Sequence, residues 1–308
     1  MNKLAIDLHS HYYPRPLAKK LIESGVLNVK DEKIILTWNG RRSEATRSII
    51  DIEDKKKELD KFQIYAVLSV PNPWTYFISD AREEVKIAKE CNDELAFLSR
   101  KFPDTFGALA TLPLGDIQGS IEEAERAVKE LGLLGFIIGT GIKGKTIADE
   151  DFYELVKFLE KLGKPIFIHP GTLFISNFED VISVIASFPF ETTYVLLKII
   201  QKGYNLKIIV PHGGGFIPYQ LGRINLLKEV FNITEFKPED YILNHLYFDS
   251  VLYKDSEVNF LVNTVGLDKV VFGTDHPFTV SQIEKSLSFM KKYGKRVLID
   301  NAIQLLGL

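Results

Sequence analysis

The chain has 308 residues, of which 45% are hydrophobic, and a formal net charge of −3. It is long enough for a large core, and it has no basic block of the kind that nucleic-acid-binding proteins carry. The single cysteine, Cys91, excludes an intramolecular disulfide framework and a cysteine-based zinc site. No stretch approaches the length of a membrane span, and the first apolar run is too short for a signal peptide. We therefore expect a soluble cytoplasmic protein, with no nucleic-acid or membrane partner.

Short apolar runs alternate with helix-like segments along the whole chain. Most of the runs are continuous, which is typical of strands buried on both faces of a parallel sheet. The runs that predict strands are residues 3–9, 65–70, 106–112, 133–139, 164–170, 206–212, 246–250 and 269–275. The segments that predict helices are residues 51–62, 79–102, 120–132, 149–163, 191–203, 218–231, 255–266 and 280–294. In the third of these, Ser120 followed by Glu123 predicts a capping box.

Eight strands that alternate with helices predict a (β/α)₈ TIM barrel, formed by residues 1–308 as a single domain. An open doubly wound sheet is the alternative. Residues 12–50 interrupt the alternation between the first strand and its helix. Within them, residues 26–40 are typical of a β-hairpin that turns at Lys30–Lys33. We expect this small β-hairpin insertion after strand 1 to lie over the mouth of the barrel.

Side chains that bind metals gather at the carboxyl ends of the predicted strands. They are His9, His11, His169, His212 and Asp275. In a barrel, all strands end at one mouth, where active sites are built. Imidazole and carboxylate groups suit a divalent ion such as Zn²⁺, and three histidines with one aspartate would hold it. The coincidence of these residues therefore predicts a metal site.

The two other histidines have more ordinary interpretations. His245 precedes the seventh predicted strand, at the opposite end of the barrel, so we expect it to be structural. His276 follows Asp275 and is expected to support the site from behind or to form a turn.

Several stretches resemble the amidohydrolase superfamily, and in particular its branch typified by α-amino-β-carboxymuconate-ε-semialdehyde decarboxylase. The most specific are "PHGGGFIPYQLGRI" and "GTDHP", and "DLHSHYYP" also fits. The resemblance implies one divalent ion, most often Zn²⁺, bound by His9, His11, His169 and Asp275. It also implies that His212 activates the metal-bound water. Mn²⁺, Co²⁺ and Fe²⁺ accept the same ligands. The fourth strand ends in "FIIGTGIKG", without a Lys or Glu to bridge two ions, which favours a single ion.

The resemblance also implies substrate-binding residues. Decarboxylases of this branch place an arginine at the position of Arg223, where it reaches the substrate carboxylate in the neighbouring subunit of a dimer. We therefore expect a homodimer and a small carboxylate substrate. Arg47 lies in the inserted segment, a region where the family has substrate-binding arginines, and Arg41 or Arg42 could serve in its place.

The aromatic side chains of Trp74 and Phe174 are further candidates for lining the substrate pocket, although ordinary packing explains them equally well.

The resemblance of the "HGGGF" and "GRI" stretches implies a metal-dependent carboxy-lyase, a non-oxidative decarboxylase that acts on a small unsaturated or aromatic carboxylic acid. In this interpretation His212 and Asp275 are catalytic, and an arginine fork binds the carboxylate in a bidentate manner. A mononuclear metal-dependent hydrolase of a lactone, amide or ester would use the same metal ligands and is the alternative. A metal-binding protein without catalysis is a third reading, and the presence of all five side chains argues against it.

Overall fold

The computed structural model describes residues 3–30, 32–38, 41–77, 80–171, 173, 182–231 and 238–308. Its parallel strands follow one another in chain order. One sheet contains β1 (Ala5–His11), β5 (Ile64–Ser69) and β6 (Phe106–Ala108). The next contains β7 (Ala110–Thr111), β8 (Phe136–Gly139), β11 (Ile166–His169), β12 (Ile208–Val210), β13 (Leu246–Asp249) and β14 (Val270–Val271). Only Leu109 separates β6 from β7, so the two sheets continue into each other.

Backbone hydrogen bonds join the two ends of this strand series. The Leu8 N–H donates to the Phe272 carbonyl over 3.0 Å, and the Asp275 N–H donates to the His9 carbonyl over 2.8 Å. The segment that follows β14 therefore lies beside β1, on the side opposite β5. This contact gives the strands the order of a closed (β/α)₈ barrel.

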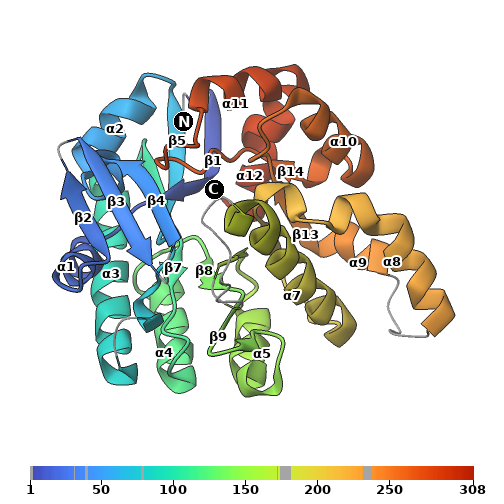
Figure 1. Cartoon of the computed structure of the whole chain (residues 1–308), viewed down its shortest axis with the longest axis horizontal. Coiled ribbons are helices and arrows are strands. Elements are labelled where there is room, and N and C mark those ends of the chain that lie inside the picture. The colour runs from blue at the N-terminus through green and yellow to red at the C-terminus, as the bar shows by residue number, and fades with distance from the viewer. Residues whose placement is uncertain are drawn as a thin grey trace.

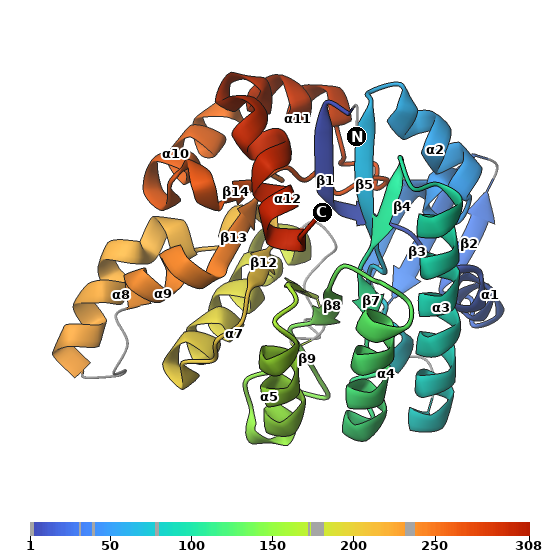
Figure 2. The same ribbon diagram turned by 180° about the vertical axis from the view of Figure 1, so that it is seen from behind.

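The helices cover the outside of the strands (Figure 1). In chain order they are α2 (Ile52–Asp60), α3 (Ala81–Lys101), α4 (Ile117–Lys129), α5 (Tyr153–Leu162), α7 (Phe188–Lys202), α8 (Ile217–Phe231), α9 (Pro238–His245), α10 (Asp255–Val265), α11 (Ile283–Met290) and α12 (Asn301–Leu306). Figure 2 shows β1 and β5 side by side from behind, flanked by α2 and α3. All residues of β1, β5, β8 and β11 are buried, as the continuous apolar runs predicted. Within the described residues, no helix has both the length and the apolar character that crossing a membrane requires.

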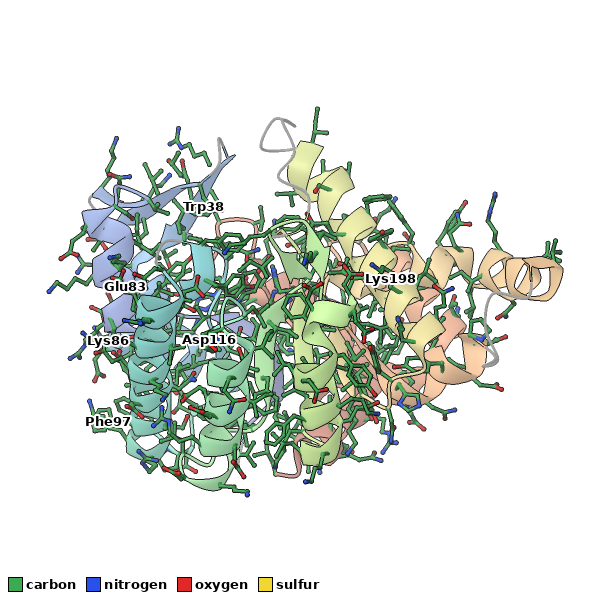
Figure 3. The ribbon with its side chains drawn as sticks, turned by 90° about the horizontal axis from the view of Figure 1, so that it is seen from below. Trp38, Glu83, Lys86, Phe97, Asp116 and Lys198 are labelled. Carbon is green, nitrogen blue, oxygen red and sulfur yellow. The ribbon has the colours of Figure 1, made fainter. Side chains whose placement is uncertain are left out.

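Two helix starts show how capping sets the element boundaries. Helix α3 begins after Asp80, whose side chain accepts hydrogen bonds from the Arg82 and Glu83 N–H groups. Lys86 and Phe97 point outward from this helix (Figure 3).

The capping box expected at Ser120 is wrong. Helix α4 begins earlier, at Ile117, because the Asp116 carboxylate accepts the Gly119 N–H over 2.8 Å. Asp116 therefore supplies the cap that Ser120 was expected to supply. The Ser120 hydroxyl lies inside the helix and donates to the Pro113 carbonyl over 2.8 Å.

The segment between β1 and α2 contains more structure than the single hairpin expected there. Strands β2 (Leu27–Lys30) and β3 (Lys33–Trp38) pair antiparallel, and β4 (Arg41–Thr46) adds a third antiparallel strand. Helix α1 (Arg15–Glu23) precedes them. Strand β4 escaped prediction because its sequence, "RRSEAT", is nearly all polar and has no apolar alternation.

This inserted sheet is attached to the loop that follows β14. The Thr46 N–H donates to the Pro277 carbonyl over 3.1 Å, and the Thr279 N–H donates to the Glu44 carbonyl over 2.9 Å. Trp38 lies at the end of β3 (Figure 3). Its ring packs edge-on against that of Phe77, with the ring centroids 5.5 Å apart. The insertion therefore lies next to the loop that carries Asp275.

A second short hairpin follows β8 and consists of β9 (Gly141–Ile142) and β10 (Lys145–Thr146), which pair antiparallel.

Candidate metal centre

The two histidines of β1 point to the same place. In an extended strand, residues two apart share a face, and the Nε2 atoms of His9 and His11 are 3.0 Å apart. Both side chains are fully buried. The other ring nitrogen of each histidine is occupied. Nδ1 of His9 donates to Asp249 Oδ2 over 2.5 Å, and Nδ1 of His11 lies 3.0 Å from the Ser69 hydroxyl. These contacts orient both rings with Nε2 towards the cluster.

His169 ends β11 and has a buried nitrogen without a partner. Its Nδ1 lies 3.0 Å from the Pro170 carbonyl, which can only accept a hydrogen bond. In the neutral ring Nδ1 therefore carries the proton, and Nε2 has a free lone pair. Nε2 has no hydrogen-bond partner among the described residues. A buried polar atom left unpaired costs free energy. This orphaned nitrogen fits a metal ligand.

Asp275 brings a carboxylate to the same point. Its Oδ1 lies 3.3 Å from Nε2 of His9 and 3.4 Å from Nε2 of His11. Two ligand atoms bound to one tetrahedral Zn²⁺ ion at about 2.1 Å are roughly 3.4 Å apart. The separations in this part of the cluster therefore suit ligands of a single ion.

His212 completes the cluster from the segment after β12. Its Nε2 lies 4.0 Å from Asp275 Oδ2, and its ring centroid lies 5.2 Å from that of His9 and 5.3 Å from that of His169. Candidate ligand atoms of His9, His169, His212 and Asp275 all lie within 4.8 Å of one another. The structure thus brings together all five side chains singled out in the sequence. It offers a second set of four, with His212 in place of His11.

Two of these residues have left-handed backbone conformations. The φ angle is +60° at Asp275 and +53° at His212, although neither is glycine. Residues in this region carry strain that the surrounding structure must hold, and they cluster at functional sites. At Asp275 the restraint includes the hydrogen bond to the His9 carbonyl. Next to His212, the Gly213 N–H donates to Asp249 Oδ1 over 3.1 Å.

The electrostatics of the cluster favour a bound cation. Burial lowers the pKa values of His169 and His212, so both rings are neutral at pH 7 and can offer a lone pair. Burial opposes ionisation of Asp275 as well, yet His9 and His11 hold the pKa of Asp275 well below its usual value. At His9 the effect of burial is overcome by Asp275 and Asp249, which raise its pKa to about 10. The negative charge of Asp275 and Asp249, which raises the pKa of His9, would also attract a metal ion.

Asp249 contacts the cluster, and the sequence analysis did not select it. It ends β13 and is fully buried, and its carboxylate accepts hydrogen bonds from His9 Nδ1 and from the N–H groups of Gly213 and Val251. The signal was present, because Asp249 stands at the end of a predicted strand, as the other candidates do. It links the β1 histidine to the turn that carries His212.

The family model described as Amidohydrolase matches residues 6–308. The chain belongs to this family. Among curated relatives, the 2-amino-3-carboxymuconate-6-semialdehyde decarboxylase of Dictyostelium discoideum is 28% identical over 335 residues, covering 99% of this chain and 92% of the relative. The gamma-resorcylate decarboxylase of a Rhizobium species is 27% identical over 261 residues, covering 76% of this chain and 80% of the relative.

A solved structure of a dihydroxybenzoic acid decarboxylase from a Polaromonas species contains manganese and the inhibitor 2-nitroresorcinol. It matches with a TM-score of 0.80 and 23% identity, covering 100% of this chain and 98% of that chain. This likeness concerns the fold and supports the TIM barrel predicted from the sequence.

Aromatic rings border the cluster of this amidohydrolase. Trp74 is buried, lies 5.9 Å from His169 between ring centroids, and stacks on Tyr76. Its indole Nε1 has no hydrogen-bond partner among the described residues. Phe188 lies 5.8 Å from His212 and Phe278 lies 5.7 Å from His11. The sequence analysis did not select these two phenylalanines. Phe174, which it did select, lies outside the described residues.

The candidate arginines lie on separate elements rather than in one cluster. Arg47 lies in a 3₁₀ turn before α2, with its side chain 43% exposed and its Nε 4.0 Å from Asp54. Arg42 pairs with Glu44 over 2.8 Å on the inserted sheet, and the side chain of Arg41 lies outside the description. Arg223 is exposed on α8. Arg42 thus pairs within the inserted sheet, and Arg47 lies near a carboxylate in the first turn of α2.

Proposed function

We propose that this amidohydrolase is a metal-dependent carboxy-lyase that removes CO₂ from a small unsaturated or aromatic carboxylic acid without an oxidant. The observation that carries the proposal is the cluster of imidazoles and one carboxylate near the ends of β1, β11, β12 and β14, which includes the buried and orphaned Nε2 of His169. The decarboxylase names of the Dictyostelium and Rhizobium relatives support the lyase chemistry. A hydrolase of a lactone, amide or ester would use the same cluster. The substrate test below distinguishes such a hydrolase from the lyase.

The proposed ligands of one divalent ion are His9, His11, His169 and Asp275. Zn²⁺ is the proposed ion, because three imidazoles and a carboxylate are ligands that it prefers, while Mn²⁺, Co²⁺ and Fe²⁺ accept the same set. When bound, such an ion acts as a Lewis acid and makes water a stronger acid. The Polaromonas structure contains manganese, so the identity of the ion is to be measured.

Decarboxylation requires a proton to be added to the substrate carbon, and residues of the chain are placed to transfer it. His212 is neutral because burial lowers its pKa, so its ring can accept a proton and return it. Asp275, 4.0 Å from His212 Nε2, is placed to pass that proton to the substrate carbon that bears the carboxylate. The C–C bond then breaks, its electron pair restores the unsaturated system, and CO₂ leaves. Trp74, Phe188 and Phe278 would hold a planar substrate and exclude water.

The carboxylate of the substrate requires cationic partners. Arg47 is the proposed partner from the same chain, with Arg41 and Arg42 as alternatives, and Arg223 is the proposed partner from a second copy. The surface of α8 around Arg223 supports a homodimer, because Tyr219 and Leu226 on the same helix are 76% and 59% exposed. The proposed compartment is the cytoplasm, which agrees with the single free and buried cysteine, Cys91.

Metal analysis with a panel of substrates tests the function. We expect purified protein to contain about one divalent ion per chain and the His9→Ala/His11→Ala variant to contain none. The loaded protein should release CO₂ from members of a panel of unsaturated and aromatic acids. Two ions per chain, with turnover of lactones or amides instead, would favour the hydrolase. No metal after reconstitution would overturn the proposal.

Replacement of Arg223 tests the shared site. We expect Arg223→Ala to raise KM for a carboxylate substrate roughly 10- to 100-fold, since a charge-assisted hydrogen bond is lost, and to leave metal content unchanged. Steady-state kinetics and metal analysis of the same samples give both readouts. Arg296→Ala, which breaks a pair with Asp268 elsewhere on the surface, is the control. An unchanged KM would remove Arg223 from the substrate site.

A further inference from the structure

A buried lysine connects the two segments that carry His11 and Asp275. Lys55 lies on α2 and is fully buried. Its Nζ donates to the His11 carbonyl over 2.9 Å and to Nδ1 of His276 over 2.8 Å, and it lies 3.5 Å from the His276 carbonyl. An ammonium group has three N–H donors, and here each faces an acceptor. A buried charge is tolerated only when it is satisfied in this way.

The charge of Lys55 is balanced through the imidazole of His276. Nε2 of His276 lies 2.6 Å from Glu58 Oε2, and Glu58 also accepts the Ser48 hydroxyl over 2.8 Å. Because Nδ1 accepts from Lys55, Nε2 carries the proton and donates to Glu58. Lys55 and Glu58 are three residues apart on α2, so they face the same side of the helix. The neutral ring thus joins the Lys55 amine to the Glu58 carboxylate.

Backbone hydrogen bonds complete the connection between the two segments. The His11 N–H donates to the His276 carbonyl over 2.7 Å, and the Asp275 N–H donates to the His9 carbonyl over 2.8 Å. Asp275 is held between these two bonds with its φ angle at +60°. Lys55 contacts both sides of this junction, the His11 carbonyl on β1 and His276 on the loop. Replacement of Lys55 would therefore remove one restraint on Asp275, the strained residue that bears the carboxylate.

We infer that Lys55, His276 and Glu58 form a clamp that holds His11 and Asp275 at the spacing a single metal ion requires, which makes Lys55 a positioning residue. This inference rests on the proposed metal site and adds residues that touch neither the metal nor the substrate. Groups that orient metal ligands typically contribute 10- to 100-fold to metal affinity. The clamp should therefore be measurable in metal binding itself, before any turnover.

The experiment compares two lysines of the same helix. Lys55→Met keeps an unbranched apolar side chain and removes the donors, whereas Lys57→Met changes a side chain that is 73% exposed. Zn²⁺ is titrated into each metal-free protein in competition with a chelating dye, and urea unfolding in EDTA gives the stability of each metal-free fold. We expect Zn²⁺ affinity to fall 10- to 100-fold in Lys55→Met and to stay unchanged in Lys57→Met. A purely structural role would lower stability and leave the affinity of the folded protein unchanged.

A double variant protects the test against misfolding. Lys55→Met alone leaves the Glu58 charge without its balance, which can destabilise the fold. Lys55→Met/Glu58→Gln removes both charges and keeps an oxygen that accepts the His276 N–H, so it is expected to fold and still to bind Zn²⁺ more weakly. Wild-type affinity in this folded variant would overturn the clamp and leave the proposed function standing. If the wild-type chain itself binds no Zn²⁺, the proposed metal site is wrong, and the proposed clamp is overturned together with it.

Discussion

The His212→Ala variant should keep its metal and lose its activity. We expect kcat to fall roughly 10²- to 10⁴-fold, the usual contribution of a positioned acid–base group, while metal content stays near that of the wild type. The reason is the proposed division of roles, in which His212 moves a proton and His9, His11, His169 and Asp275 bind the ion. Metal analysis and CO₂ release, measured on the same preparation, check both parts.

This variant also separates the two ligand sets that the cluster allows. In the wild-type chain, a ring nitrogen of His212 belongs to the compact group with His9, His169 and Asp275. If His212→Ala loses metal together with activity, His212 is a ligand, and the role of proton carrier passes to another group. His245→Ala is the matched control. His245 ends α9 directly before β13, contacts the Leu206 carbonyl and stacks on Tyr241. We expected a structural histidine at this position, before the seventh strand. Full activity in His212→Ala would remove this residue from the mechanism.

The sequence predicted the barrel and the cluster of candidate metal ligands for one physical reason. Strands of a barrel are buried on both faces, so they appear as continuous apolar runs, and their carboxyl ends meet. A histidine or aspartate at the end of such a run is therefore expected at the mouth of the barrel, even when its contacts are not known. That reasoning placed His169 and Asp275 in the same cluster, although 105 positions separate them in the chain. The same rule applied to "LYFDS" would have found Asp249.

The features that escaped prediction depend on contacts between distant segments. Strand β4 has a polar sequence, and it pairs with β3 and with the loop after β14 rather than burying an apolar face of its own. Lys55 lies in a run of charged residues that is typical of an exposed helix, yet it is buried, because His276 and the His11 carbonyl accept hydrogen bonds from its Nζ. Neither partner can be recognised from the neighbours of Lys55 in the sequence. The arginines present the same difficulty, because Arg223 is exposed on α8 and its proposed partner lies outside its own chain.

The cluster and its support form one continuous set of hydrogen bonds. Asp249 fixes the ring of His9 and the turn at Gly213, while Lys55 fixes the His11 carbonyl and the ring of His276. The strained backbone at Asp275 lies between them. Such support holds ligands in place before an ion arrives, so less of the binding energy is spent on ordering the site. The effect of a substitution should therefore depend on whether it removes a ligand or a support.

Asp275→Asn should lose metal and activity together. Asparagine has the size of aspartate and tolerates the left-handed backbone, so the variant should fold, whereas Asp275→Ala adds backbone strain. The substitution removes the charge that lies 3.3 Å from His9 Nε2 and 3.4 Å from His11 Nε2. We expect metal affinity to fall by roughly 100-fold or more, beyond the range typical of orienting groups, because a ligand itself is lost.

Chelator competition measures this loss, and urea unfolding in EDTA checks that the metal-free fold is intact. Asp268→Asn, an exposed aspartate paired with Arg296, is the control and should bind metal as the wild type does. The result is read beside that of His212→Ala, which should retain metal. Metal bound at wild-type affinity by the folded Asp275→Asn protein would mean that the three imidazoles suffice. Asp275 would then act on the proton alone, and the proposed ligand set would need a different fourth member, for which the position of His212 makes it the first candidate.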